Sequence, residues 1–262
     1  MSRTATARER PGIELAIIKM NISYSDIEKA NGSGVRVLVM DSGVDQQHPD
    51  LANVAIKNWK VGTGPYGGLA VREDPGGDAY GHGTAVCGIL HSNAPGIELN
   101  MLRVLDENIR GSSQSVIAGF KWAIEEKFDV VNCSFGTGTR EYLEAYKRMV
   151  DKAFCRNVWL VSACNNQNFE TEEYPAFFPT VISTAYGDVG ANRVKRRENS
   201  LVEFLARGLN VRVAWINKGY KTITGSSFAS PHLAALAARL RQLHPDWNAC
   251  QAKAALYELA KE

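Results

Sequence analysis

The sequence predicts an α/β fold with a mostly parallel central β-sheet and helices on both faces. Short, buried-looking apolar runs alternate along the chain with stretches of helical periodicity, which is typical of a parallel sheet covered by helices. The chain has 262 residues, of which 45% are hydrophobic, so it can bury one large core. We therefore expect an N-terminal arm or tail, residues 1–22, followed by a single domain, residues 23–262.

The predicted elements follow one another in a regular order. A short helix near residues 24–30 and an NGSG turn precede the first strand, VRVLVM, which ends at Asp41. The later strands are predicted near residues 99–104, 129–133, 158–163 and 180–184. Helices are predicted near residues 82–91, 113–126 and 140–154. Two further helices close the chain, SFASPHLAALAARLRQLH with Pro231 in its first turn, and WNACQAKAALYELAK.

Charge and cysteine content narrow the classes of function. The 30 basic and 28 acidic residues give a formal net charge of +2, which is too balanced to indicate a nucleic acid partner. The five cysteines are odd in number and scattered, which indicates buried free thiols and a reducing compartment. The opening residues lack a secretory apolar region, and no later run is long enough to span a membrane. We expect a cytoplasmic protein, or alternatively a secreted mature form whose leader has been removed.

Several polar residues follow predicted strands. Asp41 ends the first strand, Asn165 follows the strand near 158–163, and NCSFGTG completes another. In parallel sheets such residues gather at the C-terminal edge, where functional sites form. In TITGSSFASPH, Ser227 stands at a helix start and could be a nucleophile, with His82 as its base and Asp41 as the carboxylate that orients the base. Taken singly, each of these residues also fits a turn or a helix cap.

Three blocks of sequence resemble the signature motifs of the subtilisin-like serine proteases. They are VMDSGVDQQHPDL around Asp41, GHGTAVCG around His82 and GSSFASPH around Ser227, in the family's order of Asp, His and Ser. The resemblance extends from about residue 24 to 245 and implies the family's three-layer fold. It implies that Ser227 attacks the scissile carbonyl, that His82 acts as base and then acid, and that Asp41 orients His82. The Asn165 amide and the Ser227 N–H would stabilise the oxyanion.

The same resemblance implies where a substrate binds. A peptide would pair as an added strand with the extended segment formed by Ser134, Phe135 and Gly136. Cys164 replaces the family's glycine beside Asn165, on the wall of the specificity pocket. Glu173, the residue before a Tyr-Pro pair, would lie near the base of that pocket. A carboxylate there would favour Lys or Arg immediately before the cleaved bond, although these acidic residues could also form a solvated loop.

No metal site or cofactor is expected. In many secreted relatives an Asn-rich loop interrupts the helix after the catalytic His, and its oxygens bind calcium with help from the Asp of HPDL. Asp50 is present here, but GILHSNAPGIELN passes almost directly to the next strand. Too few oxygen ligands then remain for a dedicated calcium site.

One alternative to hydrolysis of peptide bonds is hydrolysis of esters on a different fold. The pattern Gly225-x-Ser227-x-Ala229 approximates the nucleophile elbow of an α/β-hydrolase esterase, but that fold places its acid and His after the serine. Only His232 and His244 follow, and His232 lies on the serine's own helix.

Two alternatives keep the subtilisin-like fold. A non-catalytic binding module would be expected to have lost a triad residue or Asn165, and all four are present. A peptide macrocyclase or transamidase would use the same site, usually with insertions that shield the acyl-enzyme. We therefore expect a serine endopeptidase that acts on peptides or proteins through an acyl-enzyme. The sequence does not indicate an oligomeric state.

Overall fold

A nine-stranded sheet forms the centre of the structure, a computed structural model that describes residues 22–261. Its strands are β1 (Arg36–Asp41), β3 (Lys57–Thr63), β4 (Leu69–Glu73), β6 (Glu98–Arg103), β7 (Val130–Cys133), β8 (Trp159–Ala163), β9 (Ile182–Gly187), β10 (Lys195–Arg196) and β11 (Phe204–Arg207). Their order is β10-β11-β9-β8-β7-β1-β6-β3-β4. The edge strands β4 and β10 are antiparallel to their neighbours, and the strands between them are parallel.

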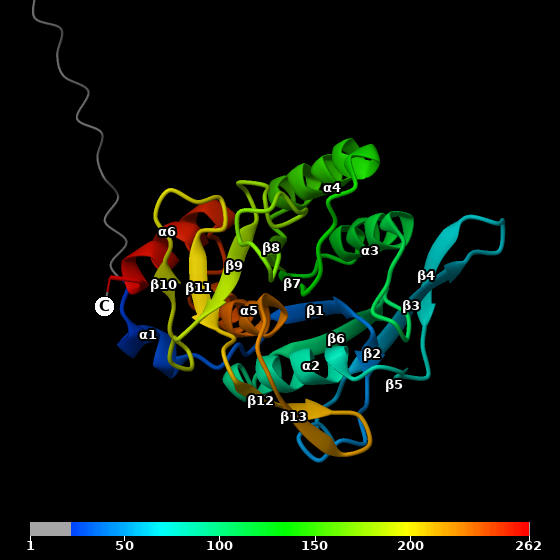
Figure 1. Ribbon diagram of the computed structural model, residues 1–262, viewed down its shortest axis with the longest axis horizontal. Helices are drawn as coiled ribbons and strands as arrows, with labels where there is room; N and C mark the ends of the chain where they lie inside the picture. Colours follow the sequence, from blue (N-terminus) through cyan, green and yellow to red (C-terminus); the bar gives the residue numbers. More distant parts are fainter. Residues whose placement is uncertain (1–21, 262) are drawn as a thin grey trace, which may run out of the picture.

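Helices cover both faces of this sheet, so the predicted three-layer α/β fold is confirmed (Figure 1). One face carries α1 (Tyr24–Lys29), α2 (His82–Asn93), α5 (Ser226–Leu243) and α6 (Ala249–Leu259). The other face carries α3 (Ser113–Glu125), the 3₁₀ turn η1 (Arg140–Tyr142) and α4 (Leu143–Cys155). Two small antiparallel pairs lie outside the main sheet, β2 (Gly43–Val44) with β5 (Gly77–Asp78) and β12 (Val211–Trp215) with β13 (Gly219–Ile223).

The central strands form because their side chains are apolar on both faces. Along β1, Val37 and Val39 pack into the core beneath α2 and α5, whereas Leu38 and Met40 pack into the core beneath α3 and α4. Successive side chains of a strand point to opposite faces, so a strand buried on both sides needs a continuous apolar run. The five strands predicted from such runs are confirmed with small shifts at their ends.

Three hairpins were not predicted, β3–β4, β10–β11 and β12–β13. In β3 and β4 most residues are half-buried or exposed, so this edge of the sheet lacks the apolar runs that revealed the central strands. Figure 1 shows β3 and β4 projecting from the sheet and the β12–β13 pair lying beside α2.

The predicted position of Pro231 needs correction. Pro231 lies inside α5, beyond its first turn, because the helix already begins at Ser226. The expected tail, residues 1–22, lies outside the described residues except for Ile22.

The five cysteines are free thiols, as predicted, but they are not all buried. Cys87, Cys133 and Cys164 are buried, whereas Cys155 at the end of α4 and Cys250 in the first turn of α6 are exposed. Both exposed residues lie on amphipathic helices, where an apolar neighbourhood in sequence does not place every position in the core. Among residues 22–261 there is no helix with the length and apolarity needed to cross a bilayer.

The chain order places a crevice at the middle of the sheet. From β1 the chain builds β3 and β6 on one side, and then returns across β1 to build β7, β8 and β9 on the other. Ligands bind at such a reversal, outside the C-terminal ends of the strands. Here the ends of β1, β7 and β8 lie side by side, and they are followed by the polar residues that were predicted to form a site.

Candidate active site

Asp41 and His82 form a buried hydrogen-bonded pair. Asp41 is the last residue of β1, and His82 is the first residue of α2. The Nδ1 atom of His82 lies 2.8 Å from Oδ1 and 3.0 Å from Oδ2 of Asp41. A carboxylate can only accept, so Nδ1 carries the proton and Nε2 is free to take another. This is the tautomer that a general base requires.

Two contacts bring the start of α2 against the residues that follow β1. The Gly83 N–H donates to Ser42 Oγ at 3.1 Å. A Cβ atom at Gly83 would lie 2.1 Å from the carbonyl oxygen of Gly43, so only glycine permits this approach. The Ser42 N–H donates to Oδ1 of Asp41 at 2.7 Å and fixes that carboxylate. The GHGT and DSG motifs are therefore packed directly on one another.

Asp78 caps α2 and contacts Ser42, the residue after Asp41. Its Oδ1 atom accepts hydrogen bonds from Ser42 Oγ at 2.9 Å, Tyr80 N at 3.1 Å and Gly81 N at 2.9 Å. Its Oδ2 atom accepts from Thr84 N at 2.9 Å and Thr84 Oγ1 at 2.7 Å. A carboxylate with these partners accepts hydrogen bonds from N–H groups that are otherwise free at the helix start. Its negative charge also interacts favourably with the positive end of the helix dipole.

The surroundings of His82 tune its basicity. Burial lowers the pKa of His82, but the Asp41 carboxylate, through its charge and hydrogen bond, and the charge of Asp78 outweigh burial. The net effect is a pKa above the ordinary value of histidine. A positive charge on the His82 ring is therefore stabilised at this position.

Ser227 lies in the first turn of α5, and the start of this helix lies near His82. The ring of Phe228, the next residue, is 5.3 Å from the His82 ring between centroids. The Ser227 hydroxyl donates to the carbonyl oxygen of Ser134 at 3.0 Å. A hydroxyl has one hydrogen, so in this state it is not donated to His82, and the hydroxyl must turn away from the Ser134 carbonyl before it can be.

A buried polar network holds the backbone of Ser227. Pro231 has no N–H, so the carbonyl of Ser227 lacks its usual intrahelical donor. The hydroxyl of Ser134 donates to that carbonyl at 2.9 Å and accepts from Asn132 Nδ2 at 2.9 Å. Ser230 Oγ donates to Asn132 Oδ1 at 2.7 Å. The proline thus frees an acceptor that ties the first turn of α5 to the segment after β7.

Asn166 joins the end of β8 to the start of α5. Its Oδ1 atom accepts from the Ser226 N–H at 2.7 Å and lies 2.9 Å from Ser226 Oγ. Ser226 Oγ is also 2.5 Å from the carbonyl oxygen of Cys164. The first N–H groups of a helix have no intrahelical acceptors. Asn166 accepts the N–H of Ser226, and among the described residues the N–H of Ser227 has no backbone acceptor.

Asn165 is held in one orientation by three hydrogen bonds. Its Oδ1 atom accepts from the backbone N–H groups of Gln167 at 2.8 Å and Asn168 at 3.0 Å. Its Nδ2 atom donates to Oε1 of Glu173 at 2.8 Å. One N–H of the amide therefore remains free.

The predicted substrate-binding residues line one hollow. This hollow has a volume of about 320 Å³. Its lining includes Ser134, Phe135, Gly136, Cys164, Asn165, Glu173 and Ser227. Burial raises the pKa of the Cys164 thiol to about 12, so this wall of the hollow is neutral.

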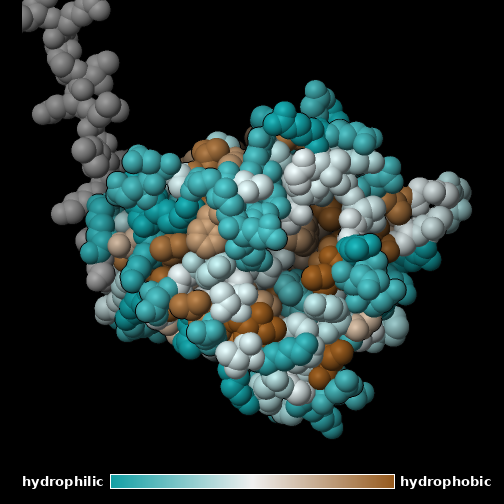
Figure 2. All heavy atoms as spheres, in the orientation of Figure 1, coloured by the Kyte–Doolittle hydropathy of each residue, from teal (hydrophilic) through white to brown (hydrophobic). Residues whose placement is uncertain are grey.

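A second hollow continues along the same segment. It has a volume of about 370 Å³ and shares Phe135 and Gly136 with the first. Leu105, Val116 and Tyr146 contribute to its lining, and Figure 2 shows hydrophobic side chains gathered in a depression on this face of the molecule. Among the described residues, the backbone of Phe135 and Gly136 makes no hydrogen bond to other backbone groups. It is therefore free to pair with an extended peptide.

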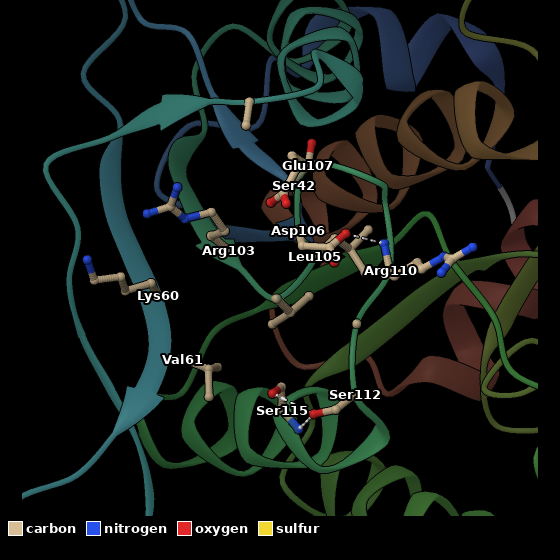
Figure 3. Close-up of a pocket in the computed structure, with 13 residues that line it drawn as sticks. Ser42, Lys60, Val61, Arg103, Leu105, Asp106, Glu107, Arg110, Ser112 and Ser115 are labelled. Carbon is tan, nitrogen blue, oxygen red and sulfur yellow. Dashed lines mark hydrogen bonds between the residues drawn. The ribbon is translucent and has the colours of Figure 1, made fainter.

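A third hollow, of about 440 Å³, lies beside Ser42 (Figure 3). Two of the basic side chains that line it form ion pairs, since Arg103 and Lys60 lie 2.6 Å and 3.8 Å from the carboxylate of Asp74. The carboxylate of Asp106 accepts hydrogen bonds from two backbone N–H groups of its own turn. These charged groups are therefore engaged within the protein, whereas Ser227 and Asn165 line the first hollow.

The residues present do not fit the calcium site considered from the sequence. The connection from Asn93 at the end of α2 to Glu98 at the start of β6 is short. Asp50 accepts a hydrogen bond from the Tyr220 hydroxyl at 2.6 Å. Within residues 22–261, no three His, Cys, Asp or Glu side chains gather as metal ligands would.

Sequence reasoning missed three residues that organise the site. Asp78 had a usable signal, because an Asp shortly before a helix start is a capping residue. Asn132 also had one, since a lone polar residue in the apolar strand VVNC must find a buried partner. Asn166 had no signal, because its partner Ser226 is distant in sequence.

Comparisons with known proteins agree with this geometry. Residues 32–262 match the family model described as the subtilase family. The chain is 31% identical over 238 residues to subtilisin E of Bacillus subtilis (strain 168), covering 85% of this chain and 59% of that protein. It is 30% identical over 236 residues to subtilisin of Bacillus pumilus, covering 85% of this chain and 82% of that protein.

Solved structures show the same likeness. A cold adapted subtilisin-like serine proteinase superimposes with a TM-score of 0.69 at 26% identity, covering 85% of this chain and 81% of its own. Sphericase superimposes with a TM-score of 0.72 at 24% identity, covering 87% and 84%, which supports the fold alone. The chain spans 59% of the length of subtilisin E and of subtilisin NAT from Bacillus subtilis subsp. natto.

Proposed function

Because the chain belongs to the subtilase family, we propose that it is a serine endopeptidase that hydrolyses peptide bonds through an acyl-enzyme. The observation that carries this proposal is the buried pair in which His82 Nδ1 donates to Asp41 at 2.8 Å. It leaves Nε2 as the acceptor, and the Phe228 ring, 5.3 Å from the His82 ring between centroids, brings the start of α5 beside the imidazole.

The reaction follows from these positions. A bound peptide pairs with the segment 134–136, and the Ser227 hydroxyl turns from the Ser134 carbonyl toward His82. The Ser227 oxygen attacks the scissile carbonyl carbon while Nε2 of His82 takes the hydroxyl proton, and the Asp41 carboxylate stabilises the imidazolium. The carbonyl π electrons move onto the oxygen, which receives hydrogen bonds from the Ser227 N–H and the free N–H of Asn165.

Collapse of this intermediate breaks the C–N bond. The amine leaves with the proton held on His82, and an ester joins the substrate's acyl group to Ser227. Water then attacks the ester, His82 takes a proton from that water, and the same proton returns to Ser227 as the acid product leaves.

The first hollow sets the preference for the residue before the cleaved bond. Its lining includes the Glu173 carboxylate and the neutral thiol of Cys164. A Lys or Arg side chain entering this hollow would pair with Glu173 where water is partly excluded, which strengthens the attraction. We therefore propose a preference for Lys or Arg at that position.

Matched peptides test the reaction and the preference together. Three peptides that differ only by Arg, Leu or Glu before the cleaved bond are incubated with the enzyme, and the products are identified by mass spectrometry. We expect the Arg peptide to be cleaved with the highest kcat/KM and to give a free carboxylic acid. Cyclised or amine-coupled products would indicate a transamidase, and no product from any peptide would indicate a binding module.

A further inference from the structure

The hydrogen bond between Asn165 and Glu173 links two parts of the site that have different tasks. Asn165 stabilises charge on the reacting carbonyl, and Glu173 lies where the substrate side chain before the cleaved bond would enter. All of the amide's hydrogen-bonding groups except one N–H are engaged, at 2.8 Å with Glu173, 2.8 Å with Gln167 and 3.0 Å with Asn168. The orientation of the remaining N–H is therefore fixed by Glu173 and its own turn.

Glu173 is itself held firmly. The adjacent Tyr174 forms a two-bond antiparallel bridge with Thr137, its N–H donating at 2.9 Å and its carbonyl accepting at 3.0 Å. The carboxylate rests on Gly136, where an added Cβ atom would lie 3.0 Å from Oε2. The loop that carries Glu173 is thus attached to the segment that pairs with substrate.

The negative charge of Glu173 has no positive partner in the described part of the chain. None of the ion pairs formed by residues 22–261 includes it. Arg197, whose charge reaches the neighbouring Cys164, is paired with Glu170. An unpaired carboxylate in a partly enclosed hollow is a site prepared for a cation.

We propose that Glu173 couples the charge of the residue in the specificity pocket to the strength of the oxyanion hole. The inference rests on the proposed peptidase function. Glu173 has two opposed effects: its oxygen orients the Asn165 amide, and its charge lies one hydrogen bond from the group that must stabilise an oxyanion. With a neutral side chain in the pocket, the carboxylate repels the developing oxyanion. A Lys or Arg side chain neutralises the carboxylate, and the oxyanion is then stabilised fully.

The consequence is a preference that is expressed in the chemical step as well as in binding. An interaction raises the acylation rate only when it is stronger in the transition state than in the bound substrate. Neutralisation of Glu173 meets this condition, because the oxyanion exists only after attack. A pocket that simply attracted a cation would change substrate binding and leave the acylation rate constant unchanged.

Glutamine and alanine at position 173 separate the two effects. Glu173→Gln keeps an acceptor oxygen for Asn165 and removes the charge. Glu173→Ala removes both. Glu172→Gln is the matched control, because Glu172 contacts the Tyr174 hydroxyl and Arg140 and does not line the hollow.

The experiment measures single-turnover acylation rate constants and substrate dissociation constants. The substrates are peptides with Arg, its uncharged isostere citrulline, or Leu before the cleaved bond. In the parent enzyme, Arg should acylate faster than citrulline. In Glu173→Gln, acylation by the citrulline peptide should rise at least about fivefold, the lower end of typical coupling between two sites. In Glu173→Ala the acylation rate constant of the citrulline peptide should fall below its value in Glu173→Gln. In Glu172→Gln the rate constants should match those of the parent enzyme.

A second background connects the effect to the oxyanion donor. In an Asn165→Ala enzyme there is no amide to orient, so Glu173→Ala and Glu173→Gln should accelerate acylation by citrulline equally. An unchanged citrulline acylation rate in Glu173→Gln, or a Glu173→Ala rate that stays below the Glu173→Gln rate in the Asn165→Ala background, would overturn the coupling. A parent enzyme that prefers Leu to Arg would refute the proposed basic preference alone, and the citrulline comparison would still decide the coupling. Thermal melting of each variant identifies any loss of folding.

Discussion

Replacement of Asp78 by Asn should destabilise the domain and shift the pH dependence of its activity. The amide keeps an oxygen for the donors of Ser42, Tyr80 and Gly81. Its NH₂ group then faces the Thr84 N–H that now donates to Oδ2 at 2.9 Å. The Thr84 hydroxyl can turn to accept from the amide, so the Thr84 N–H is the group that loses its partner.

The magnitude follows from two losses. A hydrogen bond to a charged acceptor contributes about 1.5–3 kcal/mol. A negative charge at a helix N-terminus contributes about 0.3–1 kcal/mol. Together they predict a loss of about 2–4 kcal/mol in the free energy of unfolding. At about 2–4 °C per kcal/mol for a domain near this size, the melting temperature should fall by roughly 4–16 °C.

Thermal melting in a Ser227→Ala background measures this loss without self-digestion. Asp151→Asn is the control, because Asp151 forms an exposed pair with Lys147 on α4 and should change the free energy by less than about 0.5 kcal/mol. A fall of less than about 2 °C for Asp78→Asn would refute the reasoning, because that is the shift expected from about 1 kcal/mol or less.

The same variant should alter the acid limb of the pH profile. The charge of Asp78 helps to raise the pKa of His82. A raised pKa in the folded state stabilises the fold at pH values below the ordinary histidine pKa, and this stabilisation is lost as pH rises through the folded value. Asp78→Asn should therefore cost more stability at pH 5 than at pH 8. Its kcat/KM should reach half-maximum at a lower pH, and an unchanged or higher midpoint would contradict the role given to Asp78.

Three further outcomes are expected. Asn165→Ala should lower kcat by roughly 10²–10³-fold with little change in KM, the loss known for removal of one oxyanion donor in subtilisin, and an equal loss in substrate binding would contradict this role. Chelation by EDTA should leave the melting temperature unchanged, because Asp50 is engaged by Tyr220, and a fall reversed by calcium would show an unrecognised site. N-ethylmaleimide should modify the exposed Cys155 quickly and the buried Cys164 slowly, since burial raises the pKa of Cys164 to about 12; mass spectrometry that finds Cys164 modified first would contradict this.

The sequence revealed those parts of the fold that depend on continuous burial. Strands β1, β7 and β8 are buried on both faces and appear as apolar runs, and the residues after them converge because parallel strands end at one edge. The edge hairpin of β3 and β4 is half-exposed and gave no such run. The extended conformation of β3 depends on its pairing with β6, and no pattern in its own sequence indicates it.

The candidate site divides in the same way. The motifs around Asp41, His82 and Ser227 are local, and their resemblance to a family located them. The contact between Asn165 and Glu173 depends on the bridge between Thr137 and Tyr174, which joins two loops distant in sequence.

The rotamer of Ser227 likewise depends on a distant carbonyl, that of Ser134. Such contacts follow from tertiary packing, so no single stretch of sequence contains them.

Covalent labelling with a fluorophosphonate probe tests most directly whether Ser227 is an activated nucleophile. Peptide mapping of the labelled protein should find one adduct, on Ser227, and His82→Ala should abolish its formation. Ser227→Ala should remain unlabelled and should lose hydrolysis of the Arg peptide by about 10⁶-fold, the loss known for the nucleophile of subtilisin. An adduct on another residue, or full hydrolysis by Ser227→Ala, would contradict the assignment of Ser227 as the nucleophile of a serine endopeptidase.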